Sequence, residues 1–345
     1  MPNRAGSVAG VLLALVAMEL VVRQVYHVPV AFEPGFGTII RPGATVRWRK
    51  EGRGESHWTR FGIRGREAPD LSKSSVLVLG NSFTEALQVD DDEVFTAIVD
   101  RRLRRDGIAT TVLNAGRSGA SAADYAANAP RDKSVFHPRW TVIQLSPNDL
   151  AGWAWNPQRS HFAYDGDGRL VARARPASAR GPLRTLLSPL VNHFMLLGYG
   201  HYRIEEFKDA AAAQPPLFRA AATESVTPAP TAPASPAAYP IEGEMDLLAA
   251  SYDGRVTFLF IPHLDFRSPQ LVTAAEARFD AHCRQASLSC VSLRPGYPEL
   301  AGRGLSPFGF ENSPFNEGHL NQDGHRLAAE ALAAELERLE SSGLF

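Results

Sequence analysis

The sequence has little cysteine, no excess of either charge and only one long hydrophobic run. Two cysteines in 345 residues are too few for a disulfide-built scaffold or for a zinc site made of cysteines. The 36 Lys and Arg residues nearly balance the 37 Asp and Glu residues, which argues against a basic surface for broad nucleic-acid binding. Hydrophobic residues at 44% and charged residues at 21% exclude whole-chain disorder and a multi-span membrane protein. The length allows one large domain with additions, or two domains.

The hydrophobic run lies at the N-terminus, from Val8 to Met18, and follows Arg4. It is shorter than the ~20 residues of a typical spanning helix and matches the core of a signal peptide. No good cleavage site follows, and Gly6–Val22 would span a thinned bilayer with Glu19 near the interface. We predict a signal anchor over residues 1–26, single-pass in the inner membrane, with the remainder in the periplasm or outside the cell. A cleaved signal peptide followed by secretion, or a buried core helix, are the alternatives.

The remainder of the chain alternates strand and helix patterns. Residues 27–70 alternate Gly, Pro and β-forming residues, as in a small β-rich unit. From residue 71 to 345, short apolar runs alternate with amphipathic stretches, which predicts a parallel sheet with helices on both faces. The predicted strands are Ser75–Leu79, Thr110–Leu113, Trp140–Leu145, Val256–Ile261 and Cys290–Leu293. The predicted helices are Asp92–Arg105, Ser121–Asn128, Ala274–Arg284 and Gln322–Leu339.

An insertion of about residues 150–240 separates the third and fourth predicted strands. Trp153 and Trp155 near its start would either stack on sugar rings or pack internally. A hairpin is expected around residues 165–168. The stretch 210–240 is so rich in Ala and Pro that we expect a flexible loop, because it has little apolar surface to bury.

The two cysteines lie seven residues apart, Cys283 at the end of a predicted helix and Cys290 on the next strand. In an oxidising compartment they would form a disulfide. They would serve equally well as two small buried hydrophobic side chains, so the sequence leaves both interpretations open.

Polar residues follow three of the predicted strands directly. Ser82 comes after the first strand, Gly119 after the second and Asn148 after the third, and His319 precedes the last helix. Because ligands bind at the carboxyl edge of an open parallel sheet, we expect these residues to meet there. A serine hydroxyl becomes a nucleophile when an imidazole takes its proton, and N–H donors stabilise the oxyanion that forms. The pattern therefore predicts an acyl-transfer site.

Four segments together resemble the sequence blocks of the SGNH/GDSL hydrolase family, in the family's order: GNSFT (80–84), NAGRSGAS (114–121), SPNDL (146–150) and EGHLNQDGHRLAAEAL (317–332). GIRGRE (62–67) is similar to bacterial, membrane-anchored, envelope-facing members. The resemblance implies the SGNH-hydrolase fold over residues 71–345. This fold is α/β and flavodoxin-like, with three α/β/α layers and a mostly parallel five-stranded sheet.

The resemblance also assigns the site residues. Ser82 would be the nucleophile, Gly119 and Asn148 the oxyanion donors, and His319 the general base. His325 also lies near this block, but its place in the first turn of the final helix favours local packing.

Two positions depart from the family pattern. Asn81 stands where the family has Asp, and Asn316 stands where the family has the acid three residues before the catalytic histidine. Glu317 is the nearest carboxylate. Three interpretations follow: a Ser82–His319 dyad with Asn316 orienting the ring, a triad completed by Glu317, or a site that has lost activity.

The leading functional hypothesis is a serine esterase that hydrolyses or transfers an acyl group, with an acetyl ester on cell-envelope carbohydrate as the favoured substrate. An inactive envelope protein that binds polysaccharide or an assembly partner is the second hypothesis, and a lipase or lysophospholipase is the third. The other histidines show no metal-ligand spacing, so we expect no metal or other cofactor. The expected partners are an acylated carbohydrate and the inner membrane, and no nucleic acid.

Overall fold

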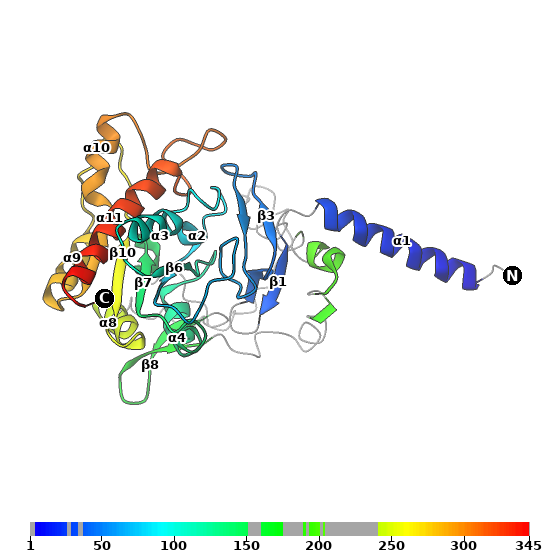
Figure 1. Ribbon diagram of the computed structural model, residues 1–345, viewed down its shortest axis with the longest axis horizontal. Coiled ribbons are helices and arrows are strands. Elements are labelled where there is room, and N and C mark those ends of the chain that lie inside the picture. The colour runs from blue at the N-terminus through cyan, green and yellow to red at the C-terminus, as the bar shows by residue number, and fades with distance from the viewer. Residues whose placement is uncertain are drawn as a thin grey trace, which may run out of the picture. The chain divides into compact units, whose positions relative to one another are not determined.

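The structure, a computed structural model, describes residues 4–25, 29–33, 37–150, 160–174, 189–190, 193–200, 203 and 241–344. Figure 1 shows the chain, which divides into two compact units. The first unit comprises Met1–Ile40 and Arg180–Ala237, and the second comprises Arg41–Ala179 and Ala238–Phe345. Trp153, Trp155 and the 210–240 stretch lie outside the described residues.

The second unit is built on a five-stranded sheet in which every neighbouring pair is parallel. Its strands are β5 (Ser75–Leu79), β6 (Thr111–Asn114), β7 (Trp140–Leu145), β10 (Val256–Phe260) and β11 (Ser289–Ser292). The order β6-β5-β7-β10-β11 is the flavodoxin-like order. All residues of β5, β7 and β10 are buried, as expected of central strands covered on both faces. The predicted fold class is confirmed.

Two cores cover the two faces of this sheet. Leu77 and Leu79 of β5 belong to the core that also contains residues of α4 (Ala122–Phe136), α8 (Ile241–Ser251) and α9 (Ala274–Gln285). Their neighbours Val76 and Val78 belong to the other core, with residues of α3 (Phe95–Arg105) and α11 (Gln322–Ser341). Successive strand residues point to opposite faces, so one apolar run supplies both cores.

The other described elements are shorter or lie outside the sheet. They are α1 (Arg4–Val25), β1 (Val30–Glu33), β2 (Gly37–Ile40), β3 (Thr45–Arg47), β4 (Glu55–His57), α2 (Ser82–Glu85), α5 (Pro147–Leu150), β8 (His161–Tyr164), β9 (Leu170–Arg173), η3 (Arg294–Gly296) and α10 (Tyr297–Gly302). β8 and β9 form the antiparallel hairpin expected around residues 165–168.

The stretch 27–70, predicted as one β-rich unit, contains two antiparallel hairpins. The β1–β2 hairpin lies in the first compact unit and the β3–β4 hairpin in the second. The domain boundaries expected from the sequence stay predictions.

Helix α4 continues past Asn128, where the sequence predicted its end, to Phe136. Pro130 lies inside the helix and supplies no N–H, so a helical hydrogen bond is missing there. The helix continues because Tyr125, Ala129 and Phe136 are buried in the core against the sheet. Tertiary packing thus overrides the local effect of proline.

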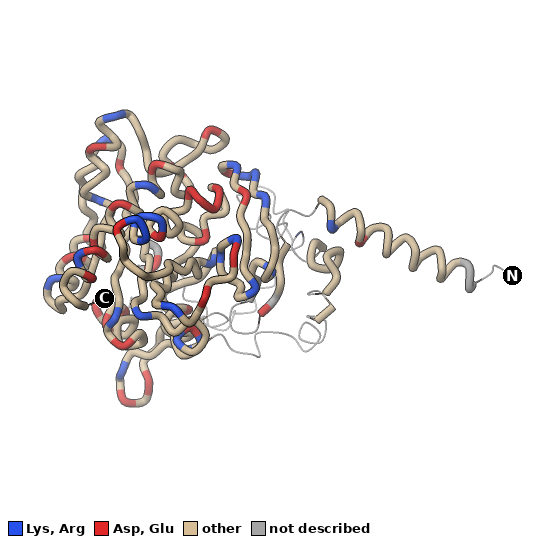
Figure 2. Tube along the Cα trace, viewed as in Figure 1, with Lys and Arg blue, Asp and Glu red and all other residues tan. Residues whose placement is uncertain are grey.

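Helix α1 is long and apolar enough from Ser7 to Val25 to cross a membrane, by length and composition alone. Figure 2 shows charged residues of both signs interspersed over the second unit, whereas α1 carries almost none. The described part of the chain therefore shows the balanced charge distribution expected from the composition.

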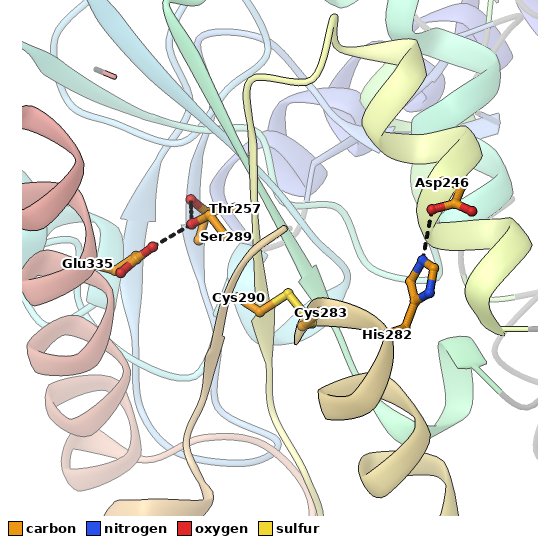
Figure 3. Close-up of a disulfide and its surroundings, with 7 residues drawn as sticks. All are labelled: Asp246, Thr257, His282, Cys283, Ser289, Cys290 and Glu335. Atoms are coloured by element: carbon orange, nitrogen blue, oxygen red, sulfur yellow. Dashed lines mark hydrogen bonds and ion pairs between the residues drawn. A yellow bond between two sulfur atoms is a disulfide. The ribbon is translucent and has the colours of Figure 1, made fainter. Parts of the chain in front are cut away.

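A disulfide joins Cys283 of α9 to Cys290 of β11, with 6.1 Å between their Cα atoms (Figure 3). Nearby, Ser289 donates its hydroxyl to Glu335 of α11 at 2.6 Å, and His282 Nε2 lies 2.7 Å from Asp246 of α8. The disulfide thus joins α9 to the edge strand β11, Ser289 joins β11 to α11, and His282 joins α9 to α8.

We expect the double variant Cys283→Ser/Cys290→Ser to lose about 2 kcal/mol of unfolding free energy, because the cross-link no longer restricts the unfolded chain. Chemical denaturation of the full chain in detergent measures the loss. Reductant should lower the stability of the parent protein to the level of the variant and leave the variant unchanged. Equal stability of the oxidised parent and the variant would contradict the expectation.

Candidate active site

Ser82 stands at the first position of α2, directly after the turn that leaves β5. The side chain of Asn81 caps this helix by accepting the N–H of Phe83 at 3.0 Å, so the Ser82 hydroxyl does not serve as the cap. Glycine is required at position 80, because a Cβ there would lie 2.0 Å from Oγ1 of Thr84. The turn presents Ser82 at the carboxyl edge of the sheet.

Asn81 also connects this turn to the loop after β7. Its Nδ2 donates to Oδ2 of Asp149 at 3.2 Å, and the same oxygen accepts the N–H and the hydroxyl of Ser146 at 2.8 and 2.7 Å. Burial, partly offset by these hydrogen bonds, raises the pKa of Asp149 to about 6. An Asp at position 81 would place a second carboxyl group against Asp149, whereas the Asn81 amide donates to it. Asn81, which departs from the family pattern, thus has Asp149 as its hydrogen-bond partner.

The loop after β6 packs against α2. Nδ2 of Asn114 donates to the carbonyl of Thr84 at 2.8 Å, and a Cβ on Gly116 would lie 2.3 Å from the backbone nitrogen of Glu85. Ser118 donates its N–H, at 3.1 Å, and its hydroxyl to the buried Glu85 carboxylate. These contacts fix the loop that carries Gly119 beside the Ser82 helix.

Gly119 has φ of +75°, and a Cβ built on it would meet nothing within 4 Å. Its backbone conformation, and not a lack of space, therefore requires glycine. Asn148, the third expected oxyanion donor, lies in α5 after β7, and the described part of this residue is its backbone.

His319 is held by a carboxylate that the sequence patterns did not reveal, that of Glu51. The backbone N–H of His319 donates to Oε1 of Glu51 at 2.7 Å, and Nδ1 lies 2.6 Å from Oε2. Both side chains are largely buried, at 29% and 17% exposure. The Glu51 carboxylate thus binds both the ring and the backbone N–H of His319.

The approach of Glu51 depends on glycines. Gly318 has φ of +80°, and a Cβ there would lie 2.1 Å from Oε1 of Glu51. Gly52 has φ of +64° and donates its N–H to Oδ1 of Asn312 at 2.8 Å, while a Cβ on it would lie 2.5 Å from the carbonyl of Gln88. The connection between β3 and β4 is therefore packed tightly against the segments beside it, and this packing places Glu51.

The expectation that Asn316 or Glu317 assists His319 finds no contact in the structure. Asn316 accepts the hydroxyl of Ser306 at 2.7 Å and donates to the carbonyl of Leu264 at 3.0 Å, so its amide braces two loops. Glu317 is exposed and has no hydrogen bond within the described residues. Glu51 occupies the position at Nδ1 that an acid at 316 would otherwise take. The sequence contains one indication that another residue supports His319, namely the missing acid at position 316. It could not identify Glu51, which lies 268 residues away.

The imidazole of His319 lies at the Ser82 turn. The ring of Phe83, the residue after Ser82, meets the His319 ring edge-to-face with 5.8 Å between centroids. His325, by contrast, is buried against Phe95, and burial lowers its pKa to about 3. The structure therefore places the ring of His319 against the residue that follows Ser82, whereas the ring of His325 packs against Phe95.

Arg64, from the GIRGRE segment, holds the C-terminal end of the serine helix. Its guanidinium donates to the carbonyls of Glu85 (2.7 Å), Ala86 and Val89 (2.8 Å), and Nε lies 3.1 Å from Oδ1 of Asp91. Glu85 and Ala86 end the helix, where carbonyls lack intrahelical partners, and Val89 lies in the segment that follows. The segment before the sheet thus supports the site at two places, through Arg64 and through Glu51.

A cavity of about 720 Å³ opens next to the Glu51 segment. Its lining includes Gly52, Arg53, Phe310, Phe315 and Asn321, and it does not include Ser82 or His319. The cavity therefore adjoins the Glu51 side of the pair and does not contain the reacting groups.

No family model matches the chain, and no curated protein matches its sequence. Among solved structures, the chain is similar to TesA, with 14% identity and a TM-score of 0.41 over 77% of this chain and 99% of that one. It is similar to a two-domain esterase active on acetylated mannans, with 16% identity and a TM-score of 0.40 over 78% of this chain, and it spans half the length of that esterase. It is also similar to a lipase/acylhydrolase from Enterococcus faecalis, with 12% identity and a TM-score of 0.41 over 76% of this chain and 95% of that one. All three TM-scores are below 0.5 and all three identities are below 25%, so these similarities assign no role to this chain.

Asp149 should make stability depend on pH in a specific window. Its pKa is about 6 in the folded chain, whereas an unfolded aspartate has a pKa of ~4. The folded chain therefore binds the proton more tightly, and this group stabilises less as the pH rises through the window. Between pH 4 and pH 6 we expect the unfolding free energy of the parent to fall by about 2 kcal/mol more than that of Asp149→Asn, which keeps an acceptor oxygen and does not titrate.

Chemical denaturation of both proteins at several pH values across this window measures the difference. Parallel pH profiles for the two proteins would show that Asp149 titrates as an ordinary aspartate.

Proposed function

We propose that this chain is a membrane-tethered serine esterase with Ser82 as nucleophile, His319 as general base and Glu51 as the acid that orients it. The observation that carries the proposal is the pairing of Glu51 with both Nδ1 and the backbone N–H of His319. The contact between Phe83 and His319, next to Ser82, supports it. The assignment needs neither Asn316 nor Glu317.

The carboxylate defines the protonation state of the ring. With Nδ1 donating its proton to Glu51, Nε2 of His319 carries the lone pair and accepts the Ser82 hydroxyl proton. The carboxylate then stabilises the imidazolium that forms during the reaction. Glu51 therefore orients the base and stabilises the charge on it.

The proposed reaction has two steps. Oγ of Ser82 attacks the ester carbonyl carbon while His319 takes the serine proton, and the tetrahedral oxyanion then expels the alcohol, which His319 protonates. Water next attacks the acyl-serine with His319 again as base, the bond from the acyl carbon to Oγ of Ser82 breaks, and His319 returns the proton to Oγ as the free acid leaves. If a sugar hydroxyl replaces water in the second step, the same site transfers the acyl group.

Three donors would hold the oxyanion: the N–H of Ser82, the N–H of Gly119 and the side-chain amide of Asn148. Within the described residues, the first two N–H groups donate to no protein acceptor. Each such donor lowers the barrier by about 3–4 kcal/mol when it is aimed at the developing charge. The family resemblance supports the Asn148 assignment.

The proposed location is the periplasmic or outer face of the inner membrane. Helix α1 supports an anchor by its length and composition, and the Cys283–Cys290 disulfide is typical of an oxidising compartment. The proposed substrate is an acetyl ester on cell-envelope carbohydrate, which rests on the family resemblance and on this location.

The inactive alternative drew its support from the two departures from the family pattern. Glu51 supplies a carboxylate to His319, and Asn81 has Asp149 as its partner, so neither departure favours loss of activity. A lipase acting on long-chain esters uses the same chemistry and differs in substrate. Parallel assays on acetylated sugars and on long-chain esters separate the two.

We expect Ser82→Ala to abolish both fluorophosphonate labelling of the protein and its turnover of p-nitrophenyl acetate. The matched control is Ser341→Ala, which removes an exposed hydroxyl from the last residue of α11 and should keep the label. Gel fluorescence and a spectrophotometric assay measure the two effects. Labelling that persists in the Ser82→Ala variant would assign the nucleophile elsewhere.

We expect Glu51→Gln to lower kcat by about 10³–10⁴-fold, as loss of the orienting carboxylate does in a serine triad. Glu317→Gln, which changes an exposed carboxylate two residues from the histidine, should keep kcat within a factor of about three, since surface changes of this kind have small effects. Steady-state kinetics on the same ester measure both variants. The reverse outcome, with Glu317→Gln inactive and Glu51→Gln active, would assign the acid to position 317.

A further inference from the structure

Helix α1 carries one carboxylate within its apolar stretch, and that carboxylate binds a second segment of the chain. Oε1 of Glu19 accepts the N–H of Met195 at 2.9 Å, and Oε2 accepts the N–H of Leu196 at 2.8 Å. Arg23, one turn further along α1, pairs with Glu19 at 2.8 Å. All these residues belong to the first compact unit.

The contact lies well inside the apolar stretch. Glu19 is six residues before Val25, which places it about 9 Å from the end of α1 at 1.5 Å per residue. The 19 residues from Ser7 to Val25 span about 28 Å, close to the ~30 Å hydrocarbon thickness of a bilayer. If Ser7–Val25 spans, Glu19 is below the headgroups and not near the interface, where the shorter run Gly6–Val22 would place it, and water does not satisfy its carboxylate there.

The pairing satisfies both partners without water. Helix-type hydrogen bonds run from Phe194 N–H to the Leu190 carbonyl and from Gly198 N–H to the Phe194 carbonyl. The N–H groups of Met195 and Leu196 instead point to the Glu19 carboxylate. In hydrocarbon, backbone donors and charged side chains need internal partners, and here each supplies the other.

The segment 189–200, described except for residues 191–192, presents an apolar surface of its own. Leu190, Phe194 and Leu197 recur at i, i+4 and i+7, and they are 45%, 42% and 45% exposed. On α1 itself, the residues from Ser7 to Val25 are exposed with the exception of Glu19 and Val22. The segment (the short green helix beside α1 in Figure 1) therefore has exposed apolar side chains, as α1 does, and Glu19 joins the two.

We propose that residues 189–200 form a second membrane contact, an apolar segment that lies in the lipid beside α1 and is pinned to it by Glu19. The exposed face of this segment contacts the bilayer that holds α1, because Glu19 binds the segment to α1 within the spanning length and the apolar side chains of both are exposed. The proposal depends on the anchor and is independent of catalytic activity. If the proposal holds, the insertion of about residues 150–240 contains a second segment that contacts the membrane.

Site-specific fluorescence in proteoliposomes tests the proposal. A nitrobenzoxadiazole label is placed on Phe194→Cys, on Leu13→Cys in α1 and on Tyr164→Cys in the second unit, without reductant so that the disulfide-bonded cysteines do not react. Phosphatidylcholine with brominated acyl chains should quench the labels at 194 and 13 by at least half and leave the label at 164 unquenched. A label at 194 that behaves like the one at 164 overturns the proposal, and an unquenched label at 13 overturns the anchor together with it.

A second variant tests the role of Glu19 separately. Glu19→Leu keeps α1 apolar but removes both acceptors, so quenching at position 194 should fall to less than half its parent value while quenching at position 13 stays the same. Met18→Leu, a change on the neighbouring exposed residue, should alter neither. Unchanged quenching at 194 in Glu19→Leu would show that Glu19 does not hold the segment.

Discussion

The candidate site depends on one short contact, that between the Glu51 carboxylate and His319. The carboxylate binds the ring at Nδ1 and the backbone at the N–H, so it fixes the position of the histidine and leaves Nε2 as the ring nitrogen for the proposed base. Two glycines in the backbone nearby make room for this contact. Gly318 leaves room for the carboxylate, and Gly52 allows the β3–β4 connection to pack where it must. The small hairpin before the sheet is therefore part of the site as well as of the fold.

Asn81 is the second position, after the acid that supports His319, at which the chain departs from the family pattern. Asn81 replaces an acid beside the serine, and its amide donates to Asp149, a buried carboxyl that accepts from Ser146 as well. Both departures from the family pattern thus change which residue carries a charge, while the groups that would contact the substrate keep their types. The arrangement supports the proposed esterase activity, with Glu51 and Asn81 as supporting residues.

The sequence predicted the sheet well and the support of the histidine poorly, for physical reasons. Buried parallel strands are continuous apolar runs, so β5 and β7 were predicted with the bounds that the structure shows. Helix α4 was predicted too short because Pro130 is unfavourable locally, whereas packing against the sheet is a tertiary effect. Glu51 was missed because no periodicity or spacing links residues so far apart; only the folded chain brings the two together.

The position of Glu51 has a practical consequence for anyone preparing a soluble fragment. A boundary chosen where the sheet begins, near residue 71, would retain the serine, the histidine and every strand of the sheet, yet it would discard Glu51 and Arg64. Inactivity of such a fragment would not test the proposed function, because the fragment lacks the carboxylate that contacts His319. A fragment that starts at Arg41, where the second compact unit begins, keeps both residues.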